Sequence, residues 1–349
     1  MSVRELNEFG YRFLGPVVTA FFDSMSFSCR ESNSKSLYFL AREGYFLKCL
    51  YAHYSRKSLI SEELKVEYLL CSRAFLFKLM LCDMSKLHIT LAHHYQGTLG
   101  EFLVRRYGLC GGDIDQVLAQ GKISKMEMQA KIKLPRDSGI VQRYMERVHN
   151  ALREQVIAKE AIYKSYLEDI GFLNSDNPKH VVDIGFSGTI QKALSDLTGQ
   201  KTVGHYMVTT KNADNTNLCE FNGYLGRDKS FSEGFSLLDR SLFLEAILTA
   251  PHGQVVDIFS IDGETRFGFS SNTKAQHQFG SLRAVVEGAK SYMDDVLPES
   301  LQLGAEEIPE YYDSLVSNMS GIPRELRAML DVDDHISGFG IINPVQLFG

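Results

Sequence analysis

The sequence lacks the marks of several common classes of protein. Its 349 residues carry 37 lysines and arginines against 43 aspartates and glutamates, so it has no excess of positive charge of the kind that binds nucleic acid. No two of the six cysteines have CxxC spacing, and no nearby histidine completes a zinc motif. Scattered cysteines of this kind are usually buried thiols of a reducing compartment. We therefore expect no nucleic-acid partner and a cytoplasmic protein.

Long apolar runs and repeats are also missing. The apolar run Phe13–Phe22 is too short to span a bilayer. Glu5 and Glu8 precede it, where a signal peptide would have basic residues. We expect a buried helix there and no membrane span.

The first part of the chain has the order of elements that is typical of a parallel sheet. Apolar residues make up 44% of the sequence, which is enough for a substantial core. Residues 1–27 are predicted to be helical. Strands are predicted at Ser36–Leu40 and Val66–Cys71, with a helix from Tyr45 to about Tyr54 between them. Residues 1–73 are therefore expected to form the first part of an α/β core.

The next hundred residues differ in character. From Ala74 to about Leu173, apolar residues recur at helical spacing between many charges, most clearly at Ile140–Ile170. No strand is predicted there, so residues 74–175 are expected to form a helical insertion between two strands of one sheet. The pair Arg105–Arg106 is interpreted as part of a solvated face.

The core is predicted to resume at residues 176–275 and to be followed by a helical region at 276–349. A further strand is predicted at Thr202–Thr209. The remaining elements predicted for the resumed core are a hairpin starting near Phe221–Tyr224, a helix at Leu237–Leu248, and a hairpin around Asp262–Gly263.

One stretch, His180–Leu194, is organised as strand, small-residue turn and helix. Its strand ends at Asp183, and the turn contains Gly185, Ser187 and Gly188. Such a turn exposes backbone N–H groups at a helix N-terminus, where an anion is favoured. A sugar phosphate is the first ligand that this pattern predicts.

This stretch resembles the phosphoribosyl loop of type I phosphoribosyltransferases. The sequence DIGFSGT at 183–189 is similar to that loop, and AREG at 41–44 is similar to the family's pyrophosphate loop. More closely, the segments SLYFLAREGYFLKCLY, YLLCSRA, VVDIGFSGTIQKAL and LFLEAILTAPHG resemble glycan phosphoribosyltransferase modules of bacterial capsule and O-antigen biosynthesis, often labelled haloacid-dehalogenase-like. The resemblance implies a phosphoribosyltransferase-like, Rossmann-like α/β fold with a mostly parallel sheet.

The resemblance also implies a reaction and its partners. The protein would transfer ribofuranose 5-phosphate from phosphoribosyl pyrophosphate (PRPP) to a hydroxyl of a surface glycan and release pyrophosphate. The acceptor is expected to be lipid-linked, which would bring the protein to the inner face of the membrane, and a separate phosphatase would act on the product. Mg²⁺ would be held mostly by substrate oxygens and water, with no direct protein ligand.

The same resemblance implies roles for individual residues. Asp183, Glu43 and Arg73 would be catalytic, with Glu43 either touching Mg²⁺ through water or acting as the base for the acceptor. The 5-phosphate would be bound by Gly185, Phe186, Ser187, Gly188, Thr189 and Ile190. Pyrophosphate would be bound by Arg42, Glu43, Gly44, Ser72 and Arg73, where arginine suits bidentate phosphate contacts. The acceptor side would include Glu245 and His252.

The sequence departs from the family pattern and leaves alternatives open. Asp183 stands alone where the family usually has two adjacent acids, and the turn after it is about one residue shorter. VVDIGxxG also begins the first motif of S-adenosylmethionine methyltransferases, although no acid ends the next predicted strand. Asp331 and Asp333 form the DxD of a haloacid-dehalogenase phosphatase, without the usual Thr or Val after it. A non-catalytic sugar-phosphate-binding module is the fourth alternative.

Overall fold

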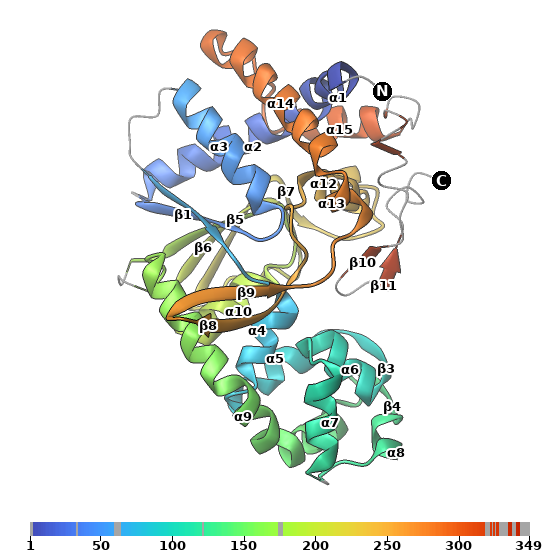
Figure 1. Ribbon diagram of the computed structural model, residues 1–349. Coiled ribbons are helices and arrows are strands. Elements are labelled where there is room, and N and C mark those ends of the chain that lie inside the picture. Colours follow the sequence, from blue (N-terminus) through green and yellow to red (C-terminus); the bar gives the residue numbers. More distant parts are fainter. Residues whose placement is uncertain are drawn as a thin grey trace.

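A five-stranded, all-parallel sheet forms the centre of this computed structural model (Figure 1). The structure describes residues 3–32, 34–58, 64–120, 122–173 and 177–317, with short stretches at 322, 324, 326–327, 334–336 and 340–342. The strand order is β2–β1–β5–β6–β7. The bounds are Ser36–Leu40 for β1, Lys65–Leu69 for β2, Lys179–Asp183 for β5, Thr202–Thr210 for β6 and Cys219–Lys229 for β7. The predicted α/β class with a mostly parallel, Rossmann-like sheet is confirmed.

Helices cover both faces of the sheet because its central strands are apolar on both sides. In β1, Leu37 and Phe39 belong to one core cluster, whereas Tyr38 and Leu40 belong to the other. Successive strand side chains point to opposite faces, so a continuous apolar strand needs two covers. The first face is covered by α2 (Gly15–Glu31) and α3 (Gly44–Lys57), and the second by α4 (Arg73–Met80), α9 (Ser138–Asp169) and α10 (Thr189–Thr198).

The two ends of the described chain pack together over the first face. The predicted N-terminal helix is confirmed as α1 (Val3–Phe9), a π-helical turn η1 (Gly10–Leu14) and α2. These pack against α14 (Phe279–Val296), as Figure 1 shows. The other C-terminal elements are α13 (Lys274–His277), η3 (Leu297–Glu299) and α15 (Ile308–Val316). Here the helical prediction holds, but β10 (Asp334–Ile336) and β11 (Gly340–Ile342) form an antiparallel pair that it missed.

The insertion forms a separate lobe below the sheet in Figure 1, and it contains two strands that were not predicted. β3 (Tyr95–Thr98) pairs antiparallel with β4 (Lys131–Leu134), so the expectation of no strand is wrong at these two places. Each strand has only four residues, too few for alternation to stand out from a helical background. The helical elements between β2 and β5 are α4, η2 (Met84–Lys86), α5 (Leu87–Leu91), α6 (Leu99–Tyr107), α7 (Gly111–Ala119), α8 (Lys125–Met128) and α9.

The segment after β6 differs from its prediction, whereas the later hairpin matches. Phe221–Tyr224 lies within β7, which runs parallel to β6, so no hairpin starts there. The residue pattern indicates a strand but not its direction. The second hairpin is confirmed as β8 (Val255–Ile261) and β9 (Glu264–Phe269) around Asp262–Gly263. The predicted helix before it is present as α11 (Ser236–Asp239) and α12 (Ser241–Leu248).

Candidate functional site

The predicted site residues lie at the carboxyl ends of neighbouring strands. From β1 the chain passes through α3 to β2 on one side, whereas β5 and β6 follow on the other side. In open parallel sheets, ligands bind at the place where the strand order reverses in this way. The loops 41–44 and 184–188 leave β1 and β5 at this place, so the structure brings both predicted loops together.

The loop after β5 is fixed along β6. Val208 N–H donates to the Ile184 carbonyl at 3.2 Å, and Thr210 N–H donates to the Phe186 carbonyl at 3.0 Å. Ser187 Oγ and Thr210 Oγ1 are hydrogen-bonded at 2.8 Å. The Gly185–Phe186 peptide is cis, as is Ala41–Arg42 in the other loop.

Gly188 sets the start of α10. Its φ of +61° is left-handed, and a Cβ there would collide with the ring of Phe221. The ten-residue helix then begins at Thr189, and the N–H groups of its first turn have no partner within the helix. This is the backbone geometry that binds a phosphate group.

The loop after β1 is folded tightly against its strand. Arg42 N–H donates to the Glu43 carboxylate at 3.1 Å, and Tyr45 N–H donates to the Arg42 carbonyl at 3.0 Å. Gly44 begins α3, and a Cβ there would lie 2.6 Å from the carbonyl carbon of Phe39. Gly44 therefore allows close helix–strand packing, and the side chains available to a ligand are those of Arg42 and Glu43.

Three carboxylates come together at this site. Burial raises the pKa of Asp183 well above its ordinary value, and the negative charges of Glu43 and Glu245 raise it further. Burial and Glu43 likewise raise the pKa of Glu245 to about 8. Asp183 also accepts a hydrogen bond from Ile184 N–H at 2.8 Å. Acids that repel one another in this way favour a cation beside them.

Two arginines lie beside these acids. Among the described residues, neither Arg42 nor Arg73 forms an ion pair within 4.0 Å. Arg73 Nε is buried without a hydrogen-bond partner. Burial lowers the pKa of Arg73, whereas the charges of Glu245 and Asp183 raise it. A buried guanidinium nitrogen without a hydrogen-bond partner indicates an anionic ligand.

The hydroxyl of Ser72 is held by hydrogen bonds within the protein. Its hydroxyl accepts the Phe75 N–H as the N-cap of α4 and donates to the Val255 carbonyl at 2.6 Å. Both contacts are internal, so the side chain holds α4 against β8. We therefore expect this hydroxyl to stabilise α4 and not to bind pyrophosphate.

The structure places the two predicted acceptor-side residues beside Arg42. Burial lowers the pKa of His252 and the charge of Arg42 lowers it further, whereas for Glu245 the same charge offsets only part of the rise. His252 Nδ1 lies 2.8 Å from the Gly253 carbonyl, so Nδ1 carries the proton. Nε2 of the neutral ring then accepts a hydrogen bond from the Tyr68 hydroxyl at 3.0 Å. His252 thus links the segment after α12 to β2, and both of its ring nitrogens are hydrogen-bonded.

The donor set of the site suits a hard cation. Glu43, Asp183 and Glu245 offer carboxylate oxygens, which Mg²⁺ prefers. These are acids whose mutual repulsion a divalent ion would relieve.

A second group of possible ligands, Cys29, His180 and His205, is better explained as a hydrogen-bonded chain. His180 Nδ1 lies 2.8 Å from His205 Nε2, and His205 Nδ1 lies 2.7 Å from the Tyr224 hydroxyl. The two imidazole centroids are 5.1 Å apart at 16°, the arrangement of rings joined edge to edge by one hydrogen bond. Burial lowers the pKa of both histidines, so neutral rings satisfy the chain without a metal.

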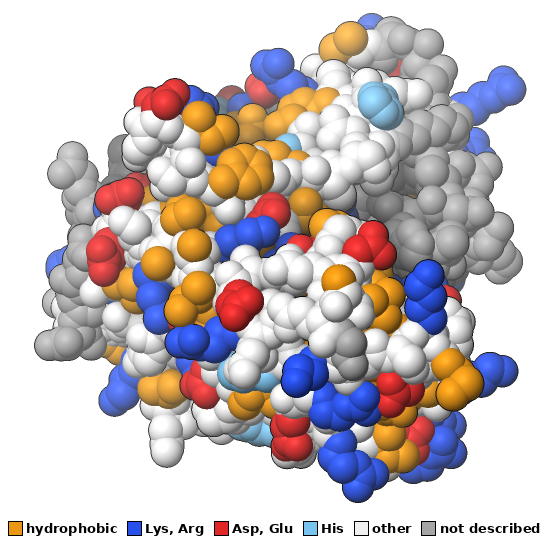
Figure 2. Space-filling view, turned by 60° about the horizontal axis from the view of Figure 1, so that its bottom comes forward, with side chains coloured by type: hydrophobic (Ala, Val, Ile, Leu, Met, Phe, Trp, Pro, Cys, Tyr) orange, Lys and Arg blue, Asp and Glu red, His pale blue; other side chains and the backbone are white. Residues whose placement is uncertain are grey.

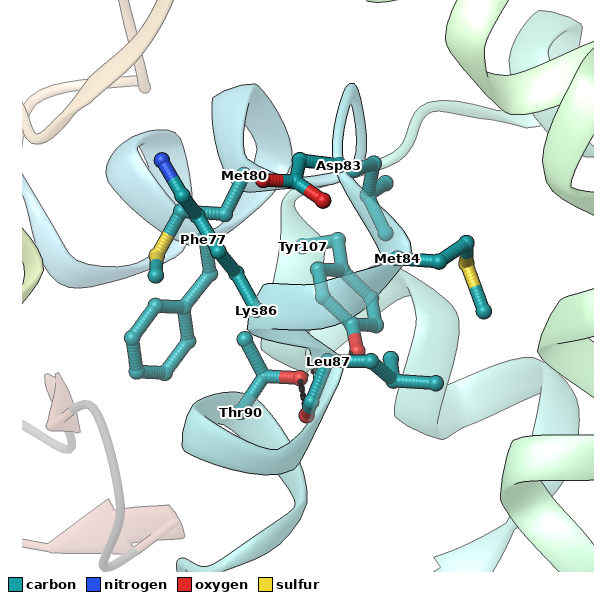
Figure 3. Close-up of a pocket in the computed structure, with 9 residues that line it drawn as sticks. Phe77, Met80, Asp83, Met84, Lys86, Leu87, Thr90 and Tyr107 are labelled. Atoms are coloured by element: carbon teal, nitrogen blue, oxygen red, sulfur yellow. Dashed lines mark hydrogen bonds between the residues drawn. The ribbon is translucent and has the colours of Figure 1, made fainter. Parts of the chain in front are cut away.

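The crevice in Figure 3 belongs to the interior of the insertion. It lies between α4, α5 and α6 and is lined largely by apolar side chains such as Phe77, Met80 and Leu87. The hydroxyls of Thr90 and Tyr107 bond each other there at 2.6 Å. We interpret this crevice as interior packing.

Sequence reasoning missed Arg106, which the fold brings close enough to Arg73 for the two charges to interact. Arg106, interpreted as part of a solvated face, is half-buried, and its Nη2 donates to the carbonyls of His93 and His94 at 3.1 Å each. Arg105 beside it is exposed as expected. The helical spacing of α6 could have separated the two, because Arg106 lies one turn from the buried Phe102 and Leu103.

Comparison of the chain with protein-family models and with curated proteins finds no match. The functional interpretation therefore depends on the geometry of the site. Within the residues that the structure describes, no helix is both long and apolar enough to cross a membrane. Asp331 and Asp333, on which the phosphatase alternative depends, lie outside the described residues.

Proposed function

We propose that the protein is a PRPP-dependent phosphoribosyltransferase that transfers ribofuranose 5-phosphate to a hydroxyl of a bacterial surface glycan. One observation carries the proposal: two loops suited to anions leave adjacent strands at the switch point, beside three carboxylates and two arginines that form no ion pair among the described residues. PRPP has the matching chemistry, with a phosphate at one end, a pyrophosphate at the other and ribose hydroxyls between.

Each group has a role in this reaction. Backbone N–H groups from Gly185 to Ile190 bind the 5-phosphate, assisted by the hydroxyls of Ser187 and Thr189. Asp183 holds the ribose hydroxyls and stabilises positive charge on the ring as the bond from the anomeric carbon to pyrophosphate breaks. Arg42 and Arg73 bind the pyrophosphate, which leaves with the electron pair.

The acceptor hydroxyl then forms its bond to the anomeric carbon and gives up a proton. Glu43 and Glu245 are the carboxylates placed to take that proton. Bound Mg²⁺ would neutralise the charge of the pyrophosphate, and Glu43 and Asp183 are the side chains that would face it. The protein's contribution is otherwise placement of the two reactants.

The methyltransferase alternative has less support from the structure. β6 ends at Thr210, followed by Lys211 and Asn212, and Asp214 is exposed in the connection to β7. That family needs an acid at the end of this strand for the ribose of its cofactor.

Binding and turnover test the proposal together. With Mg²⁺, PRPP is expected to raise the melting temperature, whereas S-adenosylmethionine is not, and a lipid-linked glycan acceptor should elicit pyrophosphate release. Asp183→Asn should lower that release by about a hundredfold or more while the protein stays folded, because the carboxylate acts on the developing charge. Asp214→Asn, at an exposed position, is the matched control and should be fully active. Full activity of Asp183→Asn, or stabilisation by S-adenosylmethionine alone, would contradict the proposal.

A further inference from the structure

A group of basic residues that form no ion pair in the described part of the chain lies where the insertion meets the sheet. It consists of Arg73, Arg106 and Lys192 with the imidazole of His93, and we call it the border cluster. Arg73 is the first residue of α4, which packs against both α6 and α10. Arg106 lies on α6 and Lys192 on α10, so three elements contribute to the cluster. Figure 2 brings the insertion forward and shows basic and acidic side chains interspersed over its surface.

The position of Arg106 is fixed by backbone contacts. Its Nη2 is committed to the carbonyls of His93 and His94, and its guanidinium lies over the ring of Phe102 at 5.5 Å. His93 in turn packs against Phe77, with the ring centroids 5.7 Å apart. Arg106 and His93 are therefore held in place at the edge of the insertion.

Lys192 links the cluster to the phosphate loop. Its Nζ donates to the Asn212 carbonyl at 2.8 Å and lies over the Phe221 ring at 5.1 Å. The same ring abuts Gly188 at the start of α10. Lys192 thus lies one turn into α10, the helix whose N-terminus is suited to a phosphate group.

Acids of the site offset the charge of Arg73, whereas Arg106, Lys192 and His93 face one another and Arg73. Burial, and after it the positive charges of Arg106, Arg73 and Lys192, lower the pKa of His93 to about 4. Burial likewise lowers the pKa of Arg106 to about 10. None of the three cations forms an ion pair with an acid in the described part of the chain. Partly buried like charges without a counter-charge favour an anion.

We propose that Arg106 and Lys192 of the border cluster bind the phosphomonoester end of the sugar donor, whereas Arg73 binds the pyrophosphate, so that the insertion completes the phosphate site formed by the loop after β5. This inference rests on the proposed function and adds to it the substrate class: the site selects a 5-phosphorylated sugar, and Arg106 and Lys192 determine that specificity. The pyrophosphate end is bound by Arg42, Glu43 and Arg73, so its binding does not depend on Arg106 or Lys192.

Calorimetric titration with two simple ligands tests this. Ribose 5-phosphate carries only the phosphomonoester, and inorganic pyrophosphate only the leaving group. Arg106→Gln and Lys192→Met should each weaken binding of ribose 5-phosphate by about ten- to a hundredfold, the usual worth of a charge-assisted hydrogen bond. Both should leave pyrophosphate binding nearly unchanged. Arg105→Gln, which removes an exposed charge from the neighbouring position on α6, should change neither.

The outcomes separate this inference from the proposed function. Unchanged affinity of both variants for ribose 5-phosphate, in a protein that binds PRPP, overturns the border cluster alone. Wild-type protein that binds none of the three ligands overturns both. If Arg106→Gln fails to fold, Lys192→Met decides, because its methylene chain still packs on Phe221. A purely structural role of Arg106 would weaken binding of both ligands alike.

Discussion

Glu245 and Asp183 are buried acids in an environment that destabilises their charged forms. Burial raises the pKa of both acids, and the negative charge of Glu43 raises it further. Such acids bind protons more tightly in the folded than in the unfolded chain, so the free energy of unfolding falls as pH rises. A site of this kind gains stability when a cation and a ligand neutralise it.

Replacing Glu245 with glutamine should make stability less dependent on pH. The pKa of Glu245 rises from an ordinary 4.5 to about 8, so the folded protein loses stability as pH rises through that window. Glu245→Gln removes this loss, and urea unfolding at the two ends of the window should show a smaller difference than in the wild type. Glu154→Gln, exposed on α9, should retain the wild-type slope. An identical slope in the Glu245 variant would mean that this acid titrates normally.

Ser72 should matter for stability and not for pyrophosphate. Ser72→Ala removes the N-cap of α4 and the hydrogen bond to Val255, with an expected loss of about 1–3 kcal/mol in the free energy of unfolding. Pyrophosphate affinity, measured by calorimetry, should stay near the wild-type value. A large loss of affinity in a folded variant would restore the predicted role of this hydroxyl.

At the scale of the element, α10 has a left-handed glycine at each end with different surroundings. Gly188 precedes the helix against the Phe221 ring, whereas a methyl group added to Gly199 would have no atom within 4 Å. Gly199→Ala should therefore cost only the backbone penalty, about 1 kcal/mol. Gly188→Ala should cost more and also abolish ribose 5-phosphate binding, because the helix start must shift. Equal losses from the two variants, measured by urea unfolding and calorimetry, would show that the start of α10 is not special.

The core elements were predictable because each carries its own local signal. β1 was predicted with the bounds it has, since a short apolar run between polar residues fits only a buried strand. β3 and β4 were not predicted because four residues are too few for the alternation of apolar and polar residues to show. The direction of β7 escaped because strand polarity depends on the path of the connection and not on the residues of the strand.

The candidate site also had residues with a local sequence signal and residues without one. Asp183, Arg42 and Glu43 were found because they end strands, and parallel strands end at one edge. Arg106 was missed because its surroundings come from His93 and His94, which only the folded insertion brings near. Helical spacing could have indicated which of the two adjacent arginines is more buried, but not which groups surround it.

For the whole molecule, the site joins the sheet to the insertion. The hairpin β8–β9 reinforces this connection: Lys159 of α9 pairs with Asp257 at 2.7 Å, and Ser72 of α4 donates to Val255. Ligand binding is therefore expected to act on both parts at once.

Hydrogen exchange should show this joint response. With PRPP at a hundred times its dissociation constant, mass action adds about 2.7 kcal/mol to the free energy of unfolding. Amides at the start of α10 and in α4 and α6 should become protected together, whereas α7 and α8 at the far end of the lobe should change little. Protection confined to the loops of the sheet would show that the insertion takes no part in binding.

The position of the insertion in the chain has a consequence for synthesis. β1 has β2 on one side, but the strand on its other side, β5, follows only after the whole insertion has been made. Until β5 leaves the ribosome, one edge of β1 presents unpaired backbone groups beside apolar side chains, which is the template on which chains associate. The insertion, which helps to form the site, therefore also prolongs the time in which the nascent chain must be protected against association with other chains.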